Sequence, residues 1–214
     1  MTSDAPRRAL LFDFDGLIVD SETKLGQALI DIFAEDGATI TFDDFGHLLG
    51  MTGPENDRQW EGFVRTHLPH TDLAAIDKRI GERVWWKDMV VLPGVHELIE
   101  KARDAGWAIG LGTGNSGPLE ELLERLELGN AFDAIVRTYR SEVPSKPAPD
   151  VFLLLAEQLG VEPHNCIVLE DSVAGCEAAI AAGMTVIACP STATRGCVFP
   201  DLVERIESLL DVTL

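Results

Sequence analysis

Two aspartates, Asp13 and Asp15, are separated by one residue and directly follow an apolar run at residues 9–12. The run is typical of a buried parallel strand, in which residues i and i+2 point to the same side. Two carboxylates this close stay ionised only when a cation or a shared proton relieves their repulsion. The spacing therefore predicts a divalent cation with oxygen ligands, and Mg²⁺ is the expected ion. The alternative is a solvated turn at the end of a strand, where Asp and Gly are common.

Further polar side chains follow other predicted strands. Two apolar runs, residues 107–111 and 166–169, each precede polar residues, and one lysine lies in a proline-stiffened loop. These polar residues are Thr113, Asn115, Lys146, Glu170 and Asp171. Since ligands of open parallel sheets bind beyond the carboxyl ends of the strands, we expect a site for a metal and a phosphate at this edge. Each residue alone could be a turn residue, a solvated lysine or a helix cap, but their joint position favours a site.

The pattern around these residues predicts an α/β fold. Apolar runs alternate with helical stretches of about ten residues, which is typical of a parallel sheet with helical crossovers. Residues 20–91 read as helical throughout, so we expect an all-helical cap domain at 20–91, inserted into a core domain of residues 1–19 and 92–214. Residues 185–188 are predicted to be the last strand and residues 202–210 a terminal helix. Asp150 is predicted to cap the start of another helix, which ends at residues 159–160.

The composition disfavours several classes of partner. The chain has 214 residues, 46% of them hydrophobic, and a formal net charge of −19. Such an acidic surface disfavours nucleic acid and anionic membranes, whereas a small phosphorylated metabolite is compatible with a local cation site. The four cysteines show no metal-binding spacing, and no signal peptide or membrane-spanning stretch is recognisable. We therefore expect a monomeric cytoplasmic protein.

Four motifs, in their order and spacing, resemble the haloacid dehalogenase superfamily, in the branch of phosphatases similar to β-phosphoglucomutase with a small helical cap. The motifs are residues 13–22, Thr113, residues 146–150 and residues 168–175. The resemblance covers essentially the whole chain. It implies a Rossmann-like parallel sheet with helices on both faces, plus the inserted cap. It also implies a Mg²⁺-dependent phosphatase acting on a small phosphorylated metabolite, with a sugar phosphate as the expected substrate.

The same resemblance implies a role for each site residue. Asp13 would be the nucleophile that forms an aspartyl-phosphate, and Asp15 the general acid and then the general base. The implied metal ligands are Asp13, Asp15 through its backbone carbonyl, Glu170 and Asp171. The implied phosphate-binding residues are Thr113, Gly114, Asn115 and Lys146. Dehalogenases of the superfamily have no acid at the position of Asp15, so dehalogenation is disfavoured.

Two other functions stay open. In a phosphosugar mutase of this branch, an arginine of the cap loop holds a second phosphate, but this chain has Gly53 at that position. Hydrolysis is therefore favoured over mutase transfer, although Arg58 is a candidate substitute. The other function is a non-enzymatic module that binds a phosphorylated metabolite, and Asp15 counts against it because mere binding needs no acid–base residue.

Overall fold

The structure is a computed structural model that describes residues 7–51, 53–84 and 86–214. Its centre is a six-stranded sheet with the order β3-β2-β1-β4-β5-β6, in which all neighbouring strands are parallel. The strands are β1 (Ala9–Phe12), β2 (Ala108–Thr113), β3 (Ala134–Arg137), β4 (Cys166–Glu170), β5 (Thr185–Ala188) and β6 (Glu204–Arg205). Residues 1–6 of the predicted core domain and residues 52 and 85 of the predicted cap domain lie outside the described ranges.

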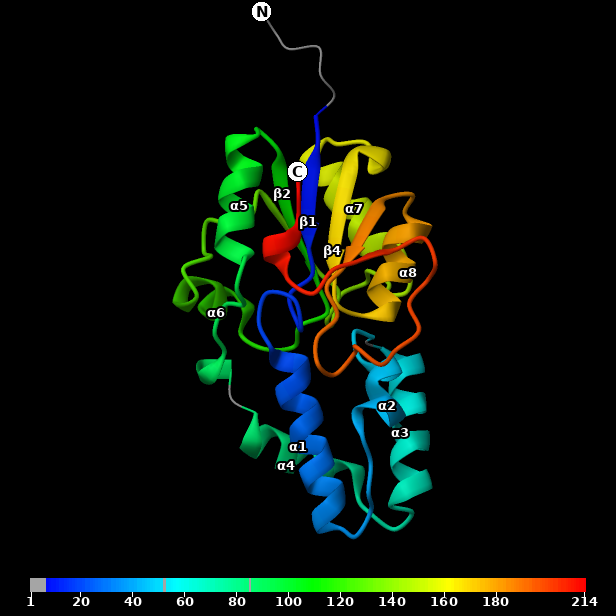
Figure 1. Ribbon diagram of the computed structural model, residues 1–214. Helices are drawn as coiled ribbons and strands as arrows, with labels where there is room; N and C mark the ends of the chain where they lie inside the picture. Colours follow the sequence, from blue (N-terminus) through cyan, green and yellow to red (C-terminus); the bar gives the residue numbers. More distant parts are fainter. Residues whose placement is uncertain (1–6, 52, 85) are drawn as a thin grey trace, which may run out of the picture.

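Helices cover both faces of the sheet. They are α5 (Val95–Asp104), α6 (Leu119–Arg125), α7 (Asp150–Leu159) and α8 (Val173–Ala181). Along β1, Leu10 and Phe12 pack in one apolar cluster with α5 and α6, while Leu11 packs in a second cluster with α7 and α8. In Figure 1 these two pairs of helices lie on opposite sides of β1. Since successive strand residues point to opposite faces, a strand that is apolar throughout is buried between two helical layers. The predicted α/β fold is confirmed.

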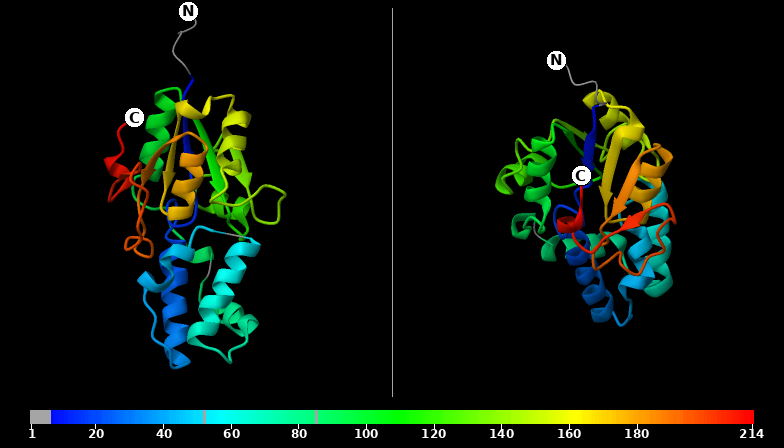
Figure 2. Two further views of the ribbon diagram at one scale, coloured as in Figure 1. Left: turned by 90° about the vertical axis from the view of Figure 1, so that its right-hand side faces the viewer. Right: turned by 45° about the horizontal axis from the view of Figure 1, so that its top comes forward.

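The chain between β1 and α5 forms what we call the helical unit. Its elements are α1 (Ser21–Glu35), α2 (Phe42–Phe45), the 3₁₀ turn η1 (Gly46–Leu48), α3 (Pro54–His67), α4 (Leu73–Arg83) and the 3₁₀ turn η2 (Trp86–Asp88). Figures 1 and 2 show it as a separate group of helices beyond one end of the sheet. It has its own apolar cluster, which includes Phe33, Phe45 and Ile76. Val19 and Val91 form an isolated antiparallel bridge where the chain leaves and re-enters the sheet region.

Glycines allow the helical unit to approach the loops of the sheet closely. A Cβ atom added at Gly50, where φ is +77°, would lie 2.2 Å from Ser172 Oγ. A Cβ atom added at Gly46 would lie 2.5 Å from the backbone oxygen of Ala193. Neither distance leaves room for a side chain, so both contacts require glycine. No helix in the described ranges is both long enough and apolar enough to cross a membrane.

The end of the chain differs from its prediction. Residues 202–210 do not form a helix, because β6 and the 3₁₀ turn η4 (Leu209–Asp211) lie there instead. Residues 185–188 are consequently not the last strand. The backbone N–H of Ile206 donates to Ala188 O at 2.9 Å, so this segment gains its hydrogen bonds from the edge of the sheet. In such a short segment, hydrogen bonds to the free edge of a neighbouring strand stabilise the chain more than a helical spacing of a few apolar residues does.

The start of α7 also differs from its prediction. Asp150 is the first helical residue and makes no capping bond, while Pro149 occupies the cap position. An acidic residue in the first turn still interacts favourably with the helix dipole. The charge of Asp150 is therefore well placed, but its predicted capping bond is wrong.

Candidate active site

The carboxyl ends of β1, β2 and β4 bring predicted site residues to one edge of the sheet. β1 lies between β2 and β4, and all three strands run in the same direction. Asp13 follows β1, Thr113 ends β2 and Glu170 ends β4, and all three residues are buried. The backbone N–H of Asp13 donates to Leu169 O at 3.1 Å, which extends the pairing of β1 with β4 as far as this aspartate.

Lys146 reaches the same edge from the loop between β3 and α7. Its Nζ donates to Asp13 Oδ1, to Glu170 Oε1 at 2.6 Å and to Gly112 O at 3.1 Å. Only 5% of the lysine is exposed. Burial alone would lower the pKa of Lys146, but the carboxylates of Asp13 and Glu170 raise it above its ordinary value. Lys146 is therefore a charged group fixed between two acids, and the alternative of a solvated surface lysine is wrong.

Three carboxylates form a buried cluster beside Lys146. Asp13, Glu170 and Asp171 each offer one oxygen, and these oxygens lie within 4.8 Å of one another. Burial raises the pKa of Asp13 to about 8, against the opposing effect of Lys146. Burial, followed by the charge of Glu170, also raises the pKa of Asp171 well above its ordinary value. Three carboxylates facing one ammonium carry an excess of negative charge, so the cluster can hold a metal cation.

Two glycines make room for this cluster. A Cβ atom at Gly16 would lie 2.0 Å from Asp171 Oδ2, and one at Gly175 would lie 1.7 Å from Glu170 Oε1. The other oxygen of Glu170, Oε2, accepts from the backbone N–H groups of Asp171 at 3.0 Å and Ser172 at 2.9 Å. The loops around the cluster therefore fix its carboxylates and exclude side chains from the space that they occupy.

Asp15 has neutral partners. Ser21 Oγ donates to Asp15 Oδ1 at 2.7 Å, and Asn115 Nδ2 lies 3.0 Å from both carboxylate oxygens of Asp15. Burial raises the pKa of Asp15, and these hydrogen bonds offset only part of that effect. The side chain of Asn115 is itself oriented, because its Oδ1 accepts from the backbone N–H of Gly117 at 2.8 Å. A positioned carboxyl with a raised pKa is suited to give and take a proton.

The predicted phosphate-binding residues of β2 and its loop lie at this edge too. Thr113 Oγ1 accepts from the backbone N–H of Asn115 at 2.9 Å. Gly114 and Asn115 line the cavity described below, together with Asp13 and Asp15. The immediate contact of the Asn115 side chain is Asp15, which the sequence pattern does not indicate. A phosphate-binding role for these residues stays a prediction.

A cavity of about 450 Å³ lies between this edge of the sheet and the helical unit. Asp13 and Asp15 line it from the sheet side. The helical unit contributes mainly apolar side chains, among them Leu25, Leu29, Trp60, Ile80, Val84 and Trp86. Of the lining residues that the structure describes, none is a lysine, an arginine or a histidine. The volume is in the range of pockets for small metabolites.

Three polar residues near this cavity have no role in the sequence analysis. Ser21 and Glu22 belong to the motif at residues 13–22, so that motif was a usable signal for them. Burial, followed by the charges of Asp15 and Asp13, raises the pKa of Glu22 to about 8. Asn56 lies on α3 and lines the cavity, and no sequence pattern marks it. Only the packing of the helical unit against the sheet brings Asn56 to the site.

Arg58, the candidate substitute for the mutase arginine, does not line the cavity. It pairs with Glu55 on the surface of α3, and 70% of its side chain is exposed. Lys24, near the start of α1, donates to Asp88 O at 2.8 Å and so connects α1 with η2. The contacts of both cations are therefore with the helical unit itself.

The chain is similar to known proteins along most of its length. The model of the haloacid dehalogenase-like hydrolase family matches residues 7–183. Hexitol phosphatase B from Escherichia coli K12 is 32% identical over 196 residues, which cover 87% of this chain and 86% of that protein. Fructose-1-phosphate phosphatase YqaB from the same strain is 31% identical over 183 residues, covering 83% and 94%. The crystal structure of CbbY from Rhodobacter sphaeroides in complex with xylulose-(1,5)bisphosphate is similar with a TM-score of 0.72 at 26% identity, covering 96% of both chains.

Proposed function

This chain belongs to the haloacid dehalogenase-like hydrolase family, and from that premise we propose that it is a Mg²⁺-dependent phosphatase acting through an aspartyl-phosphate. The observation that supports this most is the buried cluster of Asp13, Glu170 and Asp171 around Lys146, with Asp15 beside it. A nucleophile, an acid–base group, a fixed cation and a set of metal ligands are thus available at one edge of the sheet.

The proposed substrate is a small sugar phosphate or polyol phosphate. Two relatives are named for a hexitol phosphate and for fructose 1-phosphate, and both match more than four fifths of this chain. The cavity of about 450 Å³ beside Asp13 is large enough for a leaving group of that size. The net charge of −19 is compatible with such a substrate because Lys146 and a bound metal would supply local positive charge.

In the first step, an oxygen of Asp13 attacks phosphorus and the bond from phosphorus to the substrate oxygen breaks. Asp15 donates its proton to the departing alcohol, so the leaving group is neutral. Lys146 and Thr113 bind the phosphoryl oxygens and stabilise the charge that builds up on them. The products of this step are the free alcohol and an acyl phosphate on Asp13, a mixed anhydride of the carboxyl and phosphoric acid.

In the second step, water attacks the phosphorus of that acyl phosphate. Asp15, now a carboxylate, takes the proton of the attacking water, and the bond from phosphorus to Asp13 breaks to release inorganic phosphate. The raised pKa of Asp15 suits both steps, since the group must be protonated in the first and accept a proton in the second.

The donor set fits Mg²⁺. Asp13, Asp171, Glu170 and the backbone carbonyl of Asp15 offer only oxygen atoms, which hard divalent cations prefer, and the three carboxylates with Lys146 carry excess negative charge. When bound, Mg²⁺ supplies positive charge that neutralises the phosphoryl group. The ion would also allow Asp13 and Asp171 to be ionised at neutral pH, against the burial that raises the pKa of each.

We also propose that residues 20–91 act as a cap domain over the core of residues 1–19 and 92–214. Closure of the cap would exclude water other than the reacting molecule, and its opening would admit substrate.

The absence of cations among the described lining residues supports hydrolysis over a mutase reaction, which needs a partner for a second phosphate.

The test is phosphate release from a panel of phosphorylated metabolites, measured with Mg²⁺ and with EDTA. We expect release from hexitol or hexose monophosphates that requires Mg²⁺. Isomerised hexose phosphate with little free phosphate, in the presence of a bisphosphate primer, would indicate a mutase instead. Tight binding of a phosphorylated sugar without release of phosphate would indicate a binding module.

A further inference from the structure

Two buried oxygen atoms of the cavity wall lack partners. Glu22 Oε2 and Asn56 Oδ1 have no hydrogen-bond partner among the described residues, and both atoms are inaccessible to solvent. Both residues line the cavity that contains Asp13 and Asp15. Buried polar groups in folded proteins are almost always hydrogen-bonded, so each orphaned atom calls for an explanation. Two of them in one cavity indicate that a bound molecule supplies the missing hydrogen-bond partners.

Both side chains are held in place by their other atoms. Asn56 Nδ2 donates to Met51 O at 3.0 Å, which fixes the plane of the amide. The carboxyl of Glu22 lies near the backbone of Gly50, and only 8% of Glu22 is exposed, so packing restricts its side chain. The two oxygens are therefore preorganised rather than mobile, which reduces the cost of binding a ligand.

The rest of the cavity restricts what that ligand can be. Its polar groups on the helical unit include the acids Glu22 and Asp77, and no described lining residue is a cation. The nearby Lys24 and Arg58 make their contacts within the helical unit. A second phosphate would be buried without a positive partner, which is strongly unfavourable. Apolar side chains such as Trp60 and Trp86 instead present surfaces for the carbon skeleton of a ligand.

We propose that Glu22 and Asn56 are the specificity-determining residues of this enzyme, and that they bind hydroxyl groups of the leaving alcohol. The preferred substrate is then a polyol or sugar with a single phosphate, and bisphosphates are rejected. This inference rests on the proposed phosphatase function and adds to it the selection against bisphosphates and the two residues that recognise the leaving alcohol.

The experiment compares kcat/KM for three substrates: a hexitol monophosphate, a hexose bisphosphate and p-nitrophenyl phosphate, whose leaving group has no additional hydroxyl. The variants are Glu22→Met and Asn56→Leu, which remove the polar oxygens with little change in volume, and Glu22→Gln, which keeps a hydrogen-bonding group. Gln59→Ala is the control, because Gln59 lies on the same helix as Asn56 and bonds Glu55 outside the cavity.

For the unmodified protein we expect the hexitol monophosphate to be preferred over the bisphosphate by roughly 100-fold or more. Glu22→Met and Asn56→Leu should each lower the ratio of kcat/KM for hexitol phosphate to that for p-nitrophenyl phosphate by roughly 10- to 100-fold, the usual effect of losing a buried hydrogen bond to substrate. Glu22→Gln should restore most of the ratio, and Gln59→Ala should not change it.

Equal losses for both monophosphates in Glu22→Met and Asn56→Leu would overturn the inference, because a structural role would produce them, and would leave the phosphatase function standing. A ratio in Glu22→Gln as low as in Glu22→Met would overturn the hydrogen-bonding role of Glu22. Efficient hydrolysis of the bisphosphate would overturn the selection for one phosphate. Failure of the unmodified protein to release phosphate from any substrate would instead contradict the proposed function itself.

Discussion

The two walls of the cavity differ in how their polar groups are hydrogen-bonded. On the sheet side, Asp15 and Glu170 are fixed by hydrogen bonds within the protein, and Lys146 bonds two acids at once. On the side of the helical unit, the wall is mostly apolar, and Glu22 and Asn56 each keep one oxygen without a partner. The polar groups of the sheet wall are thus bonded within the protein, whereas the other wall keeps oxygens for which we propose that the substrate supplies partners. The proposed function would then place the chemistry at the sheet edge and the recognition of the leaving group on the helical unit.

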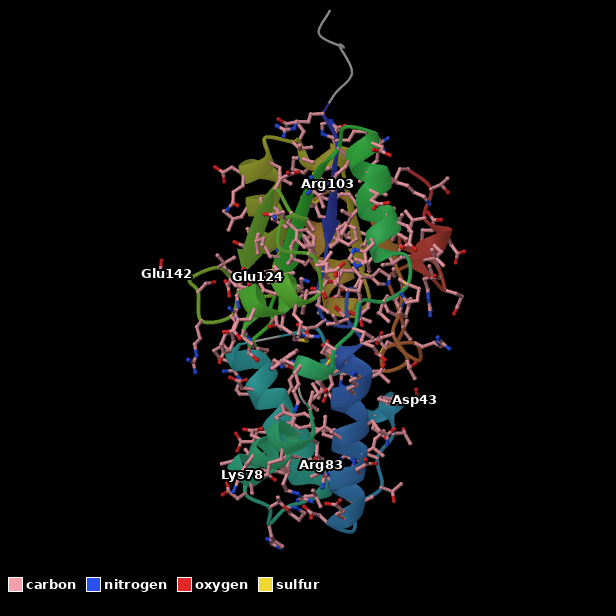
Figure 3. The ribbon with its side chains drawn as sticks, turned by 90° about the vertical axis from the view of Figure 1, so that its left-hand side faces the viewer. Asp43, Lys78, Arg83, Arg103, Glu124 and Glu142 are labelled. Carbon is pink, nitrogen blue, oxygen red and sulfur yellow. The ribbon has the colours of Figure 1, made fainter. Side chains whose placement is uncertain are left out.

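The charged side chains of the sheet edge and of the helical unit also differ, in how deeply they are buried. Lys146 is 5% exposed, and its contacts with Asp13 and Glu170 are buried. Ion pairs of the helical unit such as Arg65 with Glu61 are about half exposed, and the labelled Lys78 and Arg83 also lie in that part of the molecule (Figure 3). Solvated pairs contribute little to stability, so the helical unit is held by its apolar cluster, while the sheet edge depends on its charges.

The largest effect is expected at the sheet wall. Asp13→Asn removes the proposed nucleophile without changing the size of the side chain, and kcat should fall by roughly 10⁴-fold or more, as it does when a covalent nucleophile is lost. Steady-state phosphate release at saturating substrate measures this. Asp104→Asn, at the exposed end of α5, is the control and should retain full activity. Undiminished turnover in Asp13→Asn would rule out the aspartyl-phosphate.

The next largest effect concerns stability. Lys146→Met leaves Asp13 and Glu170 buried without their cation, so the free energy of unfolding should fall by about 3–5 kcal/mol. Arg65→Gln breaks the exposed pair with Glu61 and should cost only about 0.3–0.5 kcal/mol. Urea denaturation in the absence of divalent metal compares the two. Similar losses in both variants would contradict the contrast between the buried and the exposed charges.

The contrast also explains what could be predicted from the sequence. Asp13, Thr113, Lys146 and Glu170 come together because each follows or lies near a strand of one parallel sheet, and strand ends are readable from apolar runs. Asn56 reaches the cavity through the packing of α3 against other elements, which no local pattern encodes. The helix predicted at residues 202–210 is absent because of another long-range contact, since pairing with the edge of β5 decides the structure of residues 204–205.

The contact between the two walls should be sensitive to a single methyl group. A Cβ atom at Gly50 would lie 2.2 Å from Ser172 Oγ, which in turn bonds Glu170 Oε2 at 2.9 Å. Gly50→Ala should therefore prevent the helical unit from docking and lower kcat/KM by roughly 10- to 100-fold, with additional strain from its positive φ. Gly62→Ala on α3 is the matched control, because nothing lies within 4 Å of its added Cβ. Equal activity of the two variants would show that this contact is not needed for turnover.

The last prediction concerns the dependence of stability on pH. The pKa of Glu22 is raised from 4.5 to about 8 in the folded protein, so the folded state holds the proton more tightly than the unfolded chain does. The stability contributed by this group is complete below about pH 4.5 and is lost as the pH rises through about 8. In EDTA, Glu22 should therefore make the free energy of unfolding fall as the pH rises through that window.

Glu22→Gln removes the titrating group and should reduce that slope, as measured by urea denaturation at a series of pH values in EDTA. Part of the slope should remain, because the pKa of Asp13 is also raised, from 3.8 to about 8. Glu61→Gln, at an exposed position of α3, should leave the slope unchanged. If Glu22→Gln and the unmodified protein have the same slope, Glu22 is not held in its proton-bound form. The wall of the helical unit would then carry a buried charge like the sheet wall, and the distinction between a charged chemical wall and a neutral recognition wall would be lost.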